Sequence, residues 1–128
     1  MIMLPNARTA AQLFQALADP SRLRILKCLQ VRSCCVCELV QATGMPQPRV
    51  SRHLKVLRDA GLVADTRDAQ WVEYSLADAG AGSAQADVLA LAERWLEHDE
   101  QTDADRERLA SASRALCAVQ QPTGAASR

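Results

Sequence analysis

The sequence predicts a mainly α-helical fold with one small β-hairpin, which places the protein in the α+β class. Three observations support this prediction. A chain of 128 residues, 48% of them hydrophobic, is long enough to bury one core. The chain has only five glycines, and its alanine- and leucine-rich stretches repeat their apolar residues with the period of a helix. After Gly61 the pattern changes to segments that are rich in β-forming residues.

Two helices are predicted before the cysteine cluster at 34–37. The first spans about 7–18 and is amphipathic, and the second spans about 20–30. Asp19 is expected to cap the second helix, since its side chain accepts hydrogen bonds from free N–H groups. Pro20 suits the first turn of that helix, where its missing N–H costs nothing.

A second pair of helices follows. A short apolar helix is predicted at about 36–43, with Gly44 as its stop. Pro48 suits the first position of a longer helix that ends near Ala60, with Gly61 as a left-handed stop. Two helices joined by a short turn that contains glycine form a helix-turn-helix pattern.

The rest of the chain predicts a hairpin and two more helices. Strands are expected at 62–65 and 71–76, and helices at about 83–98 and 103–119. The chain is predicted to form a single domain over residues 1–119, with the helix-turn-helix at about 36–60, the hairpin at about 62–76 and a disordered tail at 120–128.

Composition excludes several classes of protein. No run approaches 18 apolar residues, and residues 1–8 lack the pattern of a signal peptide, so we expect a cytoplasmic protein. Aromatic residues make up only 3% of the chain, which argues against single-strand binding by base stacking.

Charge is strongly segregated along a chain whose formal net charge is zero. Residues 20–58 carry eight basic residues against one acidic residue, which is a net charge of +7. Residues 59–107 carry three basic residues against thirteen acidic ones, which is a net charge of −10. The neutral total therefore excludes a uniformly basic coat, but it allows a DNA-binding face confined to one part of the fold.

The helix predicted at 48–60 carries residues suited to reading DNA. Its apolar stripe comprises Val50, Leu54 and Leu57. The polar side and its flanks comprise Arg49, Ser51, Arg52, His53 and Lys55. Such a helix suits the major groove, where its N-terminal part meets base edges and later residues meet phosphates. For His53, a half-buried and hydrogen-bonded position is the alternative.

Two segments carry a recognisable pattern: QPRVSRHLKVLRDAGLV begins at Gln47, and DTRDAQWVEYSL begins at Asp65. They resemble the DNA-binding half of the ArsR/SmtB family of winged-helix repressors, over about residues 7–98. The resemblance implies a homodimer on an inverted-repeat operator DNA. It implies that DNA is contacted by Gln47, Arg49, Ser51, Arg52 and His53, and by Arg67 and Gln70 at the tip of the hairpin, which is called the wing. Lys55 lies further along the helix and is expected to contact phosphates. Asp68 makes this tip less basic than is usual in the family.

Three of the five cysteines, namely Cys34, Cys35 and Cys37, lie within four positions. An odd count in a reducing compartment indicates metal-binding or redox chemistry and not a disulfide framework. On an ideal helix Cys35 and Cys37 are about 200° apart. We therefore expect that an ion held by all three sulfurs distorts the helix at 36–43 and so affects the DNA-reading helix. Soft sulfur ligands favour thiophilic ions.

The resemblance extends to this cluster, because CVCEL at Cys35–Leu39 matches the metalloid box of the arsenic-sensing branch of the family. It implies As(III) or Sb(III) as the inducer, with Cys34 expected as the third ligand; Cd(II), Pb(II) and Hg(II) are plausible alternatives. Cys28 is expected in the core. For Cys117, a free thiol and an extension of the site are both open.

Other functions are weighed against this one. A repressor that senses oxidation through a disulfide is the nearest alternative. An enzyme is not expected, because thiol oxidoreductases with C-x-x-C place that motif in a βαβ unit, and helices surround it here.

The dimer is expected to form through helices 7–18 and 83–98, with Leu91 and Trp95 as anchors.

Overall fold

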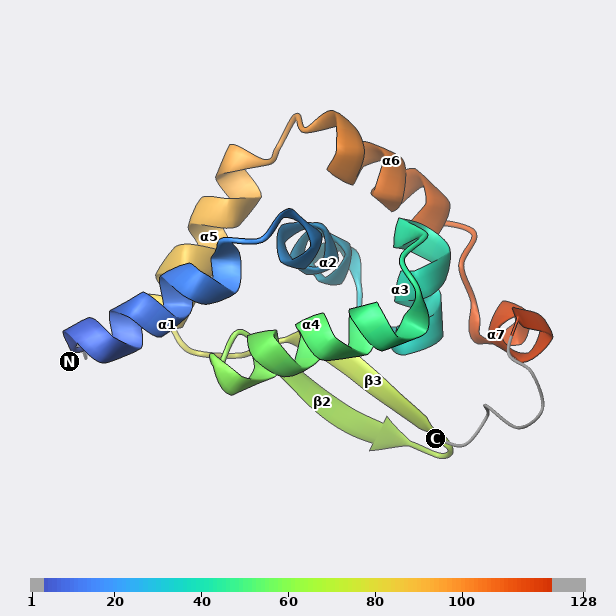
Figure 1. Cartoon of the computed structure of the whole chain (residues 1–128), viewed down its shortest axis with the longest axis horizontal. Helices are drawn as coiled ribbons and strands as arrows, with labels where there is room; N and C mark the ends of the chain where they lie inside the picture. The colour runs from blue at the N-terminus through green and yellow to red at the C-terminus, as the bar shows by residue number, and fades with distance from the viewer. Residues whose placement is uncertain (1–3, 121–128) are drawn as a thin grey trace.

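A computed structural model describes residues 4–120 and confirms a mainly helical fold with a small antiparallel sheet (Figure 1). The elements in chain order are α1 Ala7–Leu17, α2 Pro20–Val31, β1 Cys34–Cys35, α3 Val36–Thr43, α4 Gln47–Asp59, β2 Val63–Asp68, β3 Trp71–Leu76, α5 Ala84–Trp95, α6 Glu100–Leu109 and α7 Arg114–Gln120. The segment 121–128 of the predicted tail lies outside the described residues. Within residues 4–120, no helix has both the length and the apolar character needed to cross a membrane.

Local signals explain how the first helices begin and end. The Asp19 carboxylate accepts hydrogen bonds from the N–H groups of Ser21, at 2.8 Å, and Arg22, at 3.4 Å, and Pro20 opens α2. Gly44 ends α3 with a φ of 76°, which is the left-handed conformation that favours glycine. α3 therefore begins and ends where the sequence predicts.

Helix α2 lies at the centre of the molecule, where it contacts α1, α3, α4, α5 and α6, whereas α7 lies further out beside α3 (Figure 1). The largest fully buried side chains of the core are Ile25, Leu26, Leu39, Val50, Leu54, Leu57, Leu62 and Leu109. The side chains of Val50, Leu54 and Leu57 come from the stripe predicted for α4. Burying them fixes which face of α4 points away from the core.

The sheet has the order β1-β3-β2, and both pairings are antiparallel. β2 and β3 pair from Val63↔Leu76 to Asp68↔Trp71. β3 has the predicted bounds, whereas β2 continues to Asp68, beyond its predicted end at Asp65, so that only Ala69 and Gln70 form the turn. The two-residue strand β1 was not predicted. It pairs Cys34 with Tyr74 and Cys35 with Glu73, and so attaches the cysteine cluster to the hairpin.

The C-terminal part differs from the sequence prediction. The prediction of one continuous helix at 103–119 is wrong, because α6 ends at Leu109 and α7 starts at Arg114. Two serines account for the break. The Ser111 hydroxyl donates to the Arg108 carbonyl at 3.3 Å, and the Ser113 hydroxyl accepts from the Leu116 N–H at 3.4 Å, as a residue that caps a new helix does.

Candidate nucleic-acid interface and cysteine cluster

The exposed face of α4 carries most of the DNA-contacting residues predicted from the sequence. The exposed side chains are Gln47, Arg49, Ser51, Arg52 and Lys55. Two of them are held by neighbours: Arg49 donates to the Ser21 hydroxyl at 2.8 Å, and Lys55 pairs with Asp59 at 2.9 Å. No ion pair among residues 4–120 engages Arg52, so its guanidinium is available to an external acceptor.

His53 is not on this exposed face. It is 7% exposed, and its Nδ1 lies 3.3 Å from a terminal nitrogen of Arg22. Burial lowers the pKa of His53, and the nearby Arg22 adds to this effect, whereas Asp19 acts in the opposite direction. The alternative reading, a buried and hydrogen-bonded histidine that joins α4 to α2, therefore describes His53 better than a contact with DNA.

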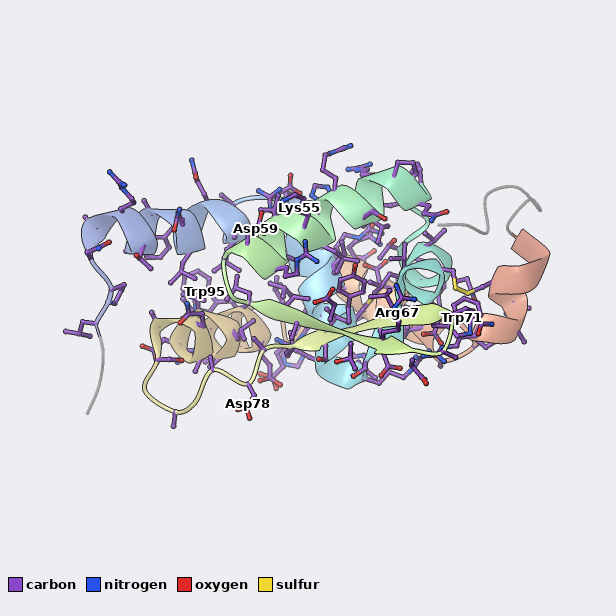
Figure 2. All side chains as sticks on the ribbon, turned by 90° about the horizontal axis from the view of Figure 1, so that it is seen from below. Lys55, Asp59, Arg67, Trp71, Asp78 and Trp95 are labelled. Atoms are coloured by element: carbon purple, nitrogen blue, oxygen red, sulfur yellow. A yellow bond between two sulfur atoms is a disulfide. The ribbon has the colours of Figure 1, made fainter. Side chains whose placement is uncertain are left out.

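The wing carries the remaining predicted contacts. Arg67 and Gln70 are exposed at the end of the hairpin, and Figure 2 shows Arg67 and Trp71 at the end that lies nearest α7. Asp68 is paired with Arg114 of α7 at 3.0 Å. The wing is thus tied by an ion pair to α7, the last helix within residues 4–120.

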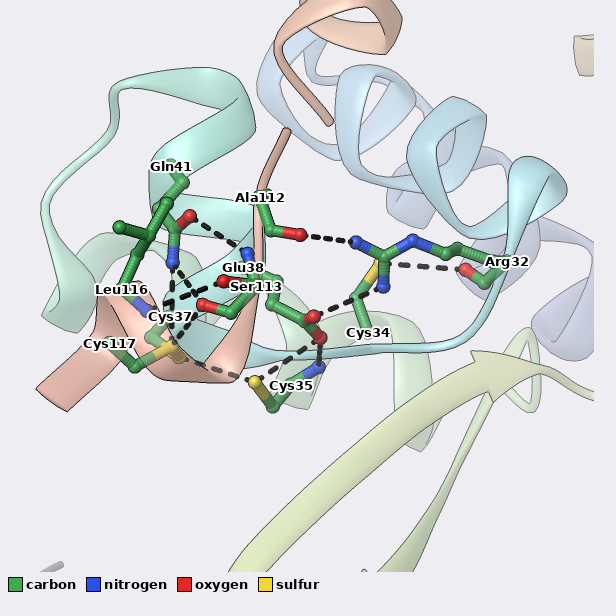
Figure 3. Close-up of a disulfide and its surroundings, with 10 residues drawn as sticks. All are labelled: Arg32, Cys34, Cys35, Cys37, Glu38, Gln41, Ala112, Ser113, Leu116 and Cys117. Carbon is green, nitrogen blue, oxygen red and sulfur yellow. Dashed lines mark hydrogen bonds and ion pairs between the residues drawn. A yellow bond between two sulfur atoms is a disulfide. The ribbon is translucent and has the colours of Figure 1, made fainter. Parts of the chain in front are cut away.

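The structure gathers three sulfurs, from Cys35, Cys37 and Cys117, within 4.8 Å of one another (Figure 3). The Sγ atoms of Cys35 and Cys37 are 3.2 Å apart, and a disulfide joins Cys37 to Cys117. All three residues are buried, and the half-buried Trp71 packs against them. Three sulfurs without an oxygen or imidazole ligand suit a thiophilic ion.

The backbone at Cys35 explains how the first two sulfurs meet. Cys35 is the residue before α3, with extended dihedral angles (φ −83°, ψ 167°). Its N–H donates to the Glu38 carboxylate at 2.9 Å, and Arg32 holds the same carboxylate at 3.2 Å. The ideal-helix separation of Cys35 and Cys37 therefore does not apply, and the expected unwinding of the helix is not needed to bring them together.

Cys34, the expected third ligand, lies apart from this group. It is fully buried in the main hydrophobic core, its Sγ donates to the Arg32 carbonyl at 3.5 Å, and burial raises its pKa to about 12. β1 causes this placement, because successive residues of a strand point to opposite faces. Cys28 is also buried, with a pKa that burial raises to about 12, so the prediction of a core position is confirmed.

Cys117 comes from the other end of the chain, 80 residues from Cys37. Gln41 of α3 holds α7 in place: its amide oxygen accepts from the Ser113 N–H at 3.1 Å, and its amide nitrogen lies 3.4 Å from the Cys117 Sγ. The serines at 111 and 113 are the sequence signal for the break between α6 and α7, after which α7 places Cys117 beside Cys37.

Two exposed aromatic side chains mark a different surface. Phe14 of α1 is 64% exposed and Trp95 of α5 is 71% exposed. Leu91, also on α5, is partly buried. α1 and α5 contact each other, and they are the two helices expected to form the dimer interface.

Residues 19–65 match the family described as "Bacterial regulatory protein, arsR family". The chain is 46% identical over 66 residues to the arsenical resistance operon repressor of Escherichia coli, covering 51% of this chain and 56% of that protein. It is 41% identical over 70 residues to an uncharacterised HTH-type transcriptional regulator of Methanocaldococcus jannaschii, covering 54% of this chain and 79% of that protein.

Among solved structures, the chain is similar to a homodimeric winged helix-turn-helix DNA-binding domain of Mycobacterium bovis. The TM-score is 0.60 at 27% identity, and the match covers 78% of this chain and 94% of that one. In the family match, residues 19–65 include Cys35, Cys37 and α4 but not Cys117. The matched segment spans about half the length of the Escherichia coli repressor.

Proposed function

The chain belongs to the ArsR family of bacterial regulatory proteins, and on that premise we propose that it is a cytoplasmic, dimeric repressor that leaves its operator DNA when a trivalent metalloid, As(III) or Sb(III), binds to cysteine thiols. The observation that carries the proposal is the group of three buried sulfurs, from Cys35, Cys37 and Cys117, at the start of α3. α3 is the helix that immediately precedes the DNA-reading helix α4.

DNA recognition in this proposal rests on the exposed face of α4. Gln47, Arg49, Ser51 and Arg52 lie in its first half, which is the part of a recognition helix that meets base edges in the major groove. Lys55 lies further along and is assigned to phosphates, as are Arg67 and Gln70 in the wing. Phe14 and Trp95 are assigned to the dimer interface, which presents the two copies of α4 to the two halves of an inverted repeat.

The buried site favours a neutral ligand. Arsenous acid is uncharged, and in protein whose Cys37–Cys117 disulfide a thiol reductant has reduced, three thiols replace its three hydroxide groups: three As–S bonds form, three As–O bonds break, and each thiol proton leaves in a water molecule. The product carries no net charge. A divalent cation that displaces three thiol protons instead leaves a complex of charge −1, which a buried site disfavours.

Two features of the cluster strengthen this preference. Burial raises the pKa of Cys35, so that the neutral thiol is the stable form. The Glu38 carboxylate lies 3.3 Å from the Cys35 Sγ, where it opposes further negative charge. Both features support the assignment of As(III) or Sb(III), in preference to Cd(II), Pb(II) and Hg(II), as the ligand.

Release follows if the ligand-bound and DNA-bound states differ in conformation, as any coupling between two sites requires. An ion held by all three sulfurs lies between them, and therefore draws Cys35, Cys37 and α7 into a new arrangement. α3 contacts both α4 and α7, so a shift at its start changes the position from which α4 reads DNA.

The disulfide between Cys37 and Cys117 supports a second candidate, a repressor that senses oxidation. Two thiols and one molecule of peroxide give one disulfide and two waters, so that the sulfurs are oxidised and the peroxide is reduced. The same α3–α7 contact would then be changed by a bond between the sulfurs and not by an ion.

One experiment separates these functions. Reduced protein on labelled operator DNA is titrated in parallel with arsenite, antimonite, Cd(II), Zn(II) and hydrogen peroxide. Release by arsenite and antimonite at the lowest concentrations supports the metalloid sensor. Release by peroxide alone supports the redox sensor, and release by Zn(II) or Cd(II) alone contradicts both.

A further inference from the structure

Arg114, at the start of α7, bridges the cysteine cluster and the wing. Its guanidinium pairs with the carboxylates of Asp68, at 3.0 Å, and Glu73, at 3.2 Å. The guanidinium carbon lies 5.4 Å from the centre of the Trp71 ring, which is within the range of a cation–π contact. One helical turn further along α7 is Cys117.

The wing needs this positive charge, because its own charges are mostly acidic. It carries Asp65, Asp68 and Glu73, and Arg67 is its one basic residue. Asp65 is paired with Arg58 of α4, at 3.2 Å. Arg114 pairs with the other two carboxylates and offsets part of their negative charge, which would otherwise add to the repulsion between the wing and the phosphates of DNA.

The cysteine cluster contacts two of the residues that surround Arg114, namely Glu73 and Trp71. Cys35 is paired with Glu73 in the sheet, through β1 and β3. Trp71 packs against the three cysteines, and its ring also contacts the Arg114 guanidinium. A change in the position of Cys117 therefore acts on the wing through two connected routes, namely the sheet and α7.

We propose that Arg114 is the residue through which the cysteine cluster controls the wing. When the ligand draws Cys117 into a three-sulfur site, α7 moves and withdraws Arg114 from Asp68 and Glu73. The two carboxylates are then uncovered, and the wing is repelled from the DNA backbone. This inference rests on the proposed function, because it describes how occupancy of that same site reaches the DNA.

The first test removes the charge of Arg114. Reduced Arg114→Gln protein, without ligand, is expected to bind operator DNA about tenfold more weakly than wild type at low salt, and the difference is expected to shrink as salt screens the repulsion. Arg114→Lys is expected to recover most of the affinity. The matched control is Arg106→Gln, since Arg106 pairs with Asp103 on α6, at 2.8 Å, away from the wing.

The second test removes the carboxylates and does not depend on whether Arg114→Gln folds. The double variant Asp68→Asn, Glu73→Gln is expected to bind arsenite as wild type does, with one ion per chain, but to keep most of its operator affinity when arsenite is bound. Adding Arg114→Gln to this variant is expected to weaken operator binding no further.

The results of these tests distinguish the role of Arg114 from the proposed function. Equal operator affinity of wild type and Arg114→Gln, together with normal arsenite release by the double variant, overturns the role of Arg114 and leaves the metalloid sensor intact. Failure of arsenite to bind wild-type protein, or to release it from operator DNA, overturns the proposed function. The salt-dependent loss of operator affinity in Arg114→Gln without ligand tests the charge of the wing independently.

Discussion

Arg24 of α2 and Asp105 of α6 form a bidentate ion pair, with nitrogen–oxygen distances of 2.8 and 3.0 Å. The Asp105 carboxylate is fully buried, and Arg108 also donates to it at 2.7 Å. The two arginines also donate to the last carbonyls of α3, those of Ala42 and Thr43. The Asp105 carboxylate and the two arginines that it binds therefore join α2, α3 and α6.

We expect Asp105→Asn to lower the free energy of unfolding by about 3 kcal/mol, because the mostly buried guanidinium of Arg24 then loses the carboxylate that compensates its charge. Urea unfolding measures the change. Asp103→Asn, which breaks an exposed pair with Arg106, is the matched control and is expected to cost less than about 1 kcal/mol. Similar losses in the two variants would show that burial of the Asp105 carboxylate contributes nothing.

Arg52→Ala is expected to weaken operator binding by about 1–3 kcal/mol, which is the cost of losing one good contact to a base edge. Arsenite binding is expected to stay at the wild-type level, since Arg52 is on the exposed face of α4 and does not touch the cluster. Fluorescence anisotropy on operator DNA measures the loss, with Arg106→Ala as the control. Unchanged affinity would remove Arg52 from the DNA-reading face.

Two cysteine variants distinguish the third ligand of the metalloid. Cys117→Ser is expected to lower arsenite affinity at least about tenfold and to leave a repressor that stays on DNA in arsenite. Cys34→Ala is expected to release as wild type does, because the Cys34 side chain lies in the main core and not with the other sulfurs. The opposite pattern would assign the third ligand to Cys34. Isothermal titration with arsenite provides the affinities.

The Cys37–Cys117 disulfide is expected to block the metalloid and to stabilise the fold. Oxidised protein keeps only Cys35 of the cluster as a thiol, so arsenite binding is expected to appear only after reduction. The bond also closes a long loop, with a sequence separation of 80 residues, and reduction is expected to lower the free energy of unfolding by about 2–4 kcal/mol. Urea unfolding with and without reductant tests this, and Cys37→Ser protein is expected to show no effect of reductant.

His53 predicts a pH dependence of stability. Burial, the largest cause, lowers the pKa of His53 in the folded protein below the value of about 6.5 that it has when unfolded. The unfolded chain therefore binds the proton first as the pH falls. The stability linked to neutral His53 is fully present above pH 6.5 and is lost as the pH falls through the lower pKa of the folded state.

The measurement is the urea midpoint between pH 8 and pH 5. His53→Gln is expected to flatten part of the decline, whereas His98→Gln, at an exposed position, is expected to keep the wild-type profile. An unchanged profile in His53→Gln would show that protonation of His53 does not oppose folding.

Much of the fold follows from local signals. Asp19 and Pro20 determine the start of α2, and Gly44 determines the end of α3, because each acts through hydrogen bonds or dihedral angles within a few residues. The stripe of α4 is equally local, since helical periodicity alone separates Leu54 from Arg52.

The parts that sequence reasoning missed depend on distant partners. β1 is only two residues long and exists because β3 lies beside it. His53 is buried because Arg22 of α2 packs against it. The cluster is the clearest case: Cys34 was the neighbour in sequence, but the turn at 111–113 brings Cys117 to Cys37, and no periodic pattern near Cys117 reports its partner across the domain.

The break between α6 and α7 also bears on the lifetime of the protein. Because Cys117 lies in the last described helix, an inducer that ties it to α3 fastens that end of the chain to the body of the domain. Ligands that bind only the folded state stabilise it, and fewer openings expose the chain to proteases. A repressor displaced by its inducer would therefore persist, and repression could resume from existing molecules as soon as the inducer is removed.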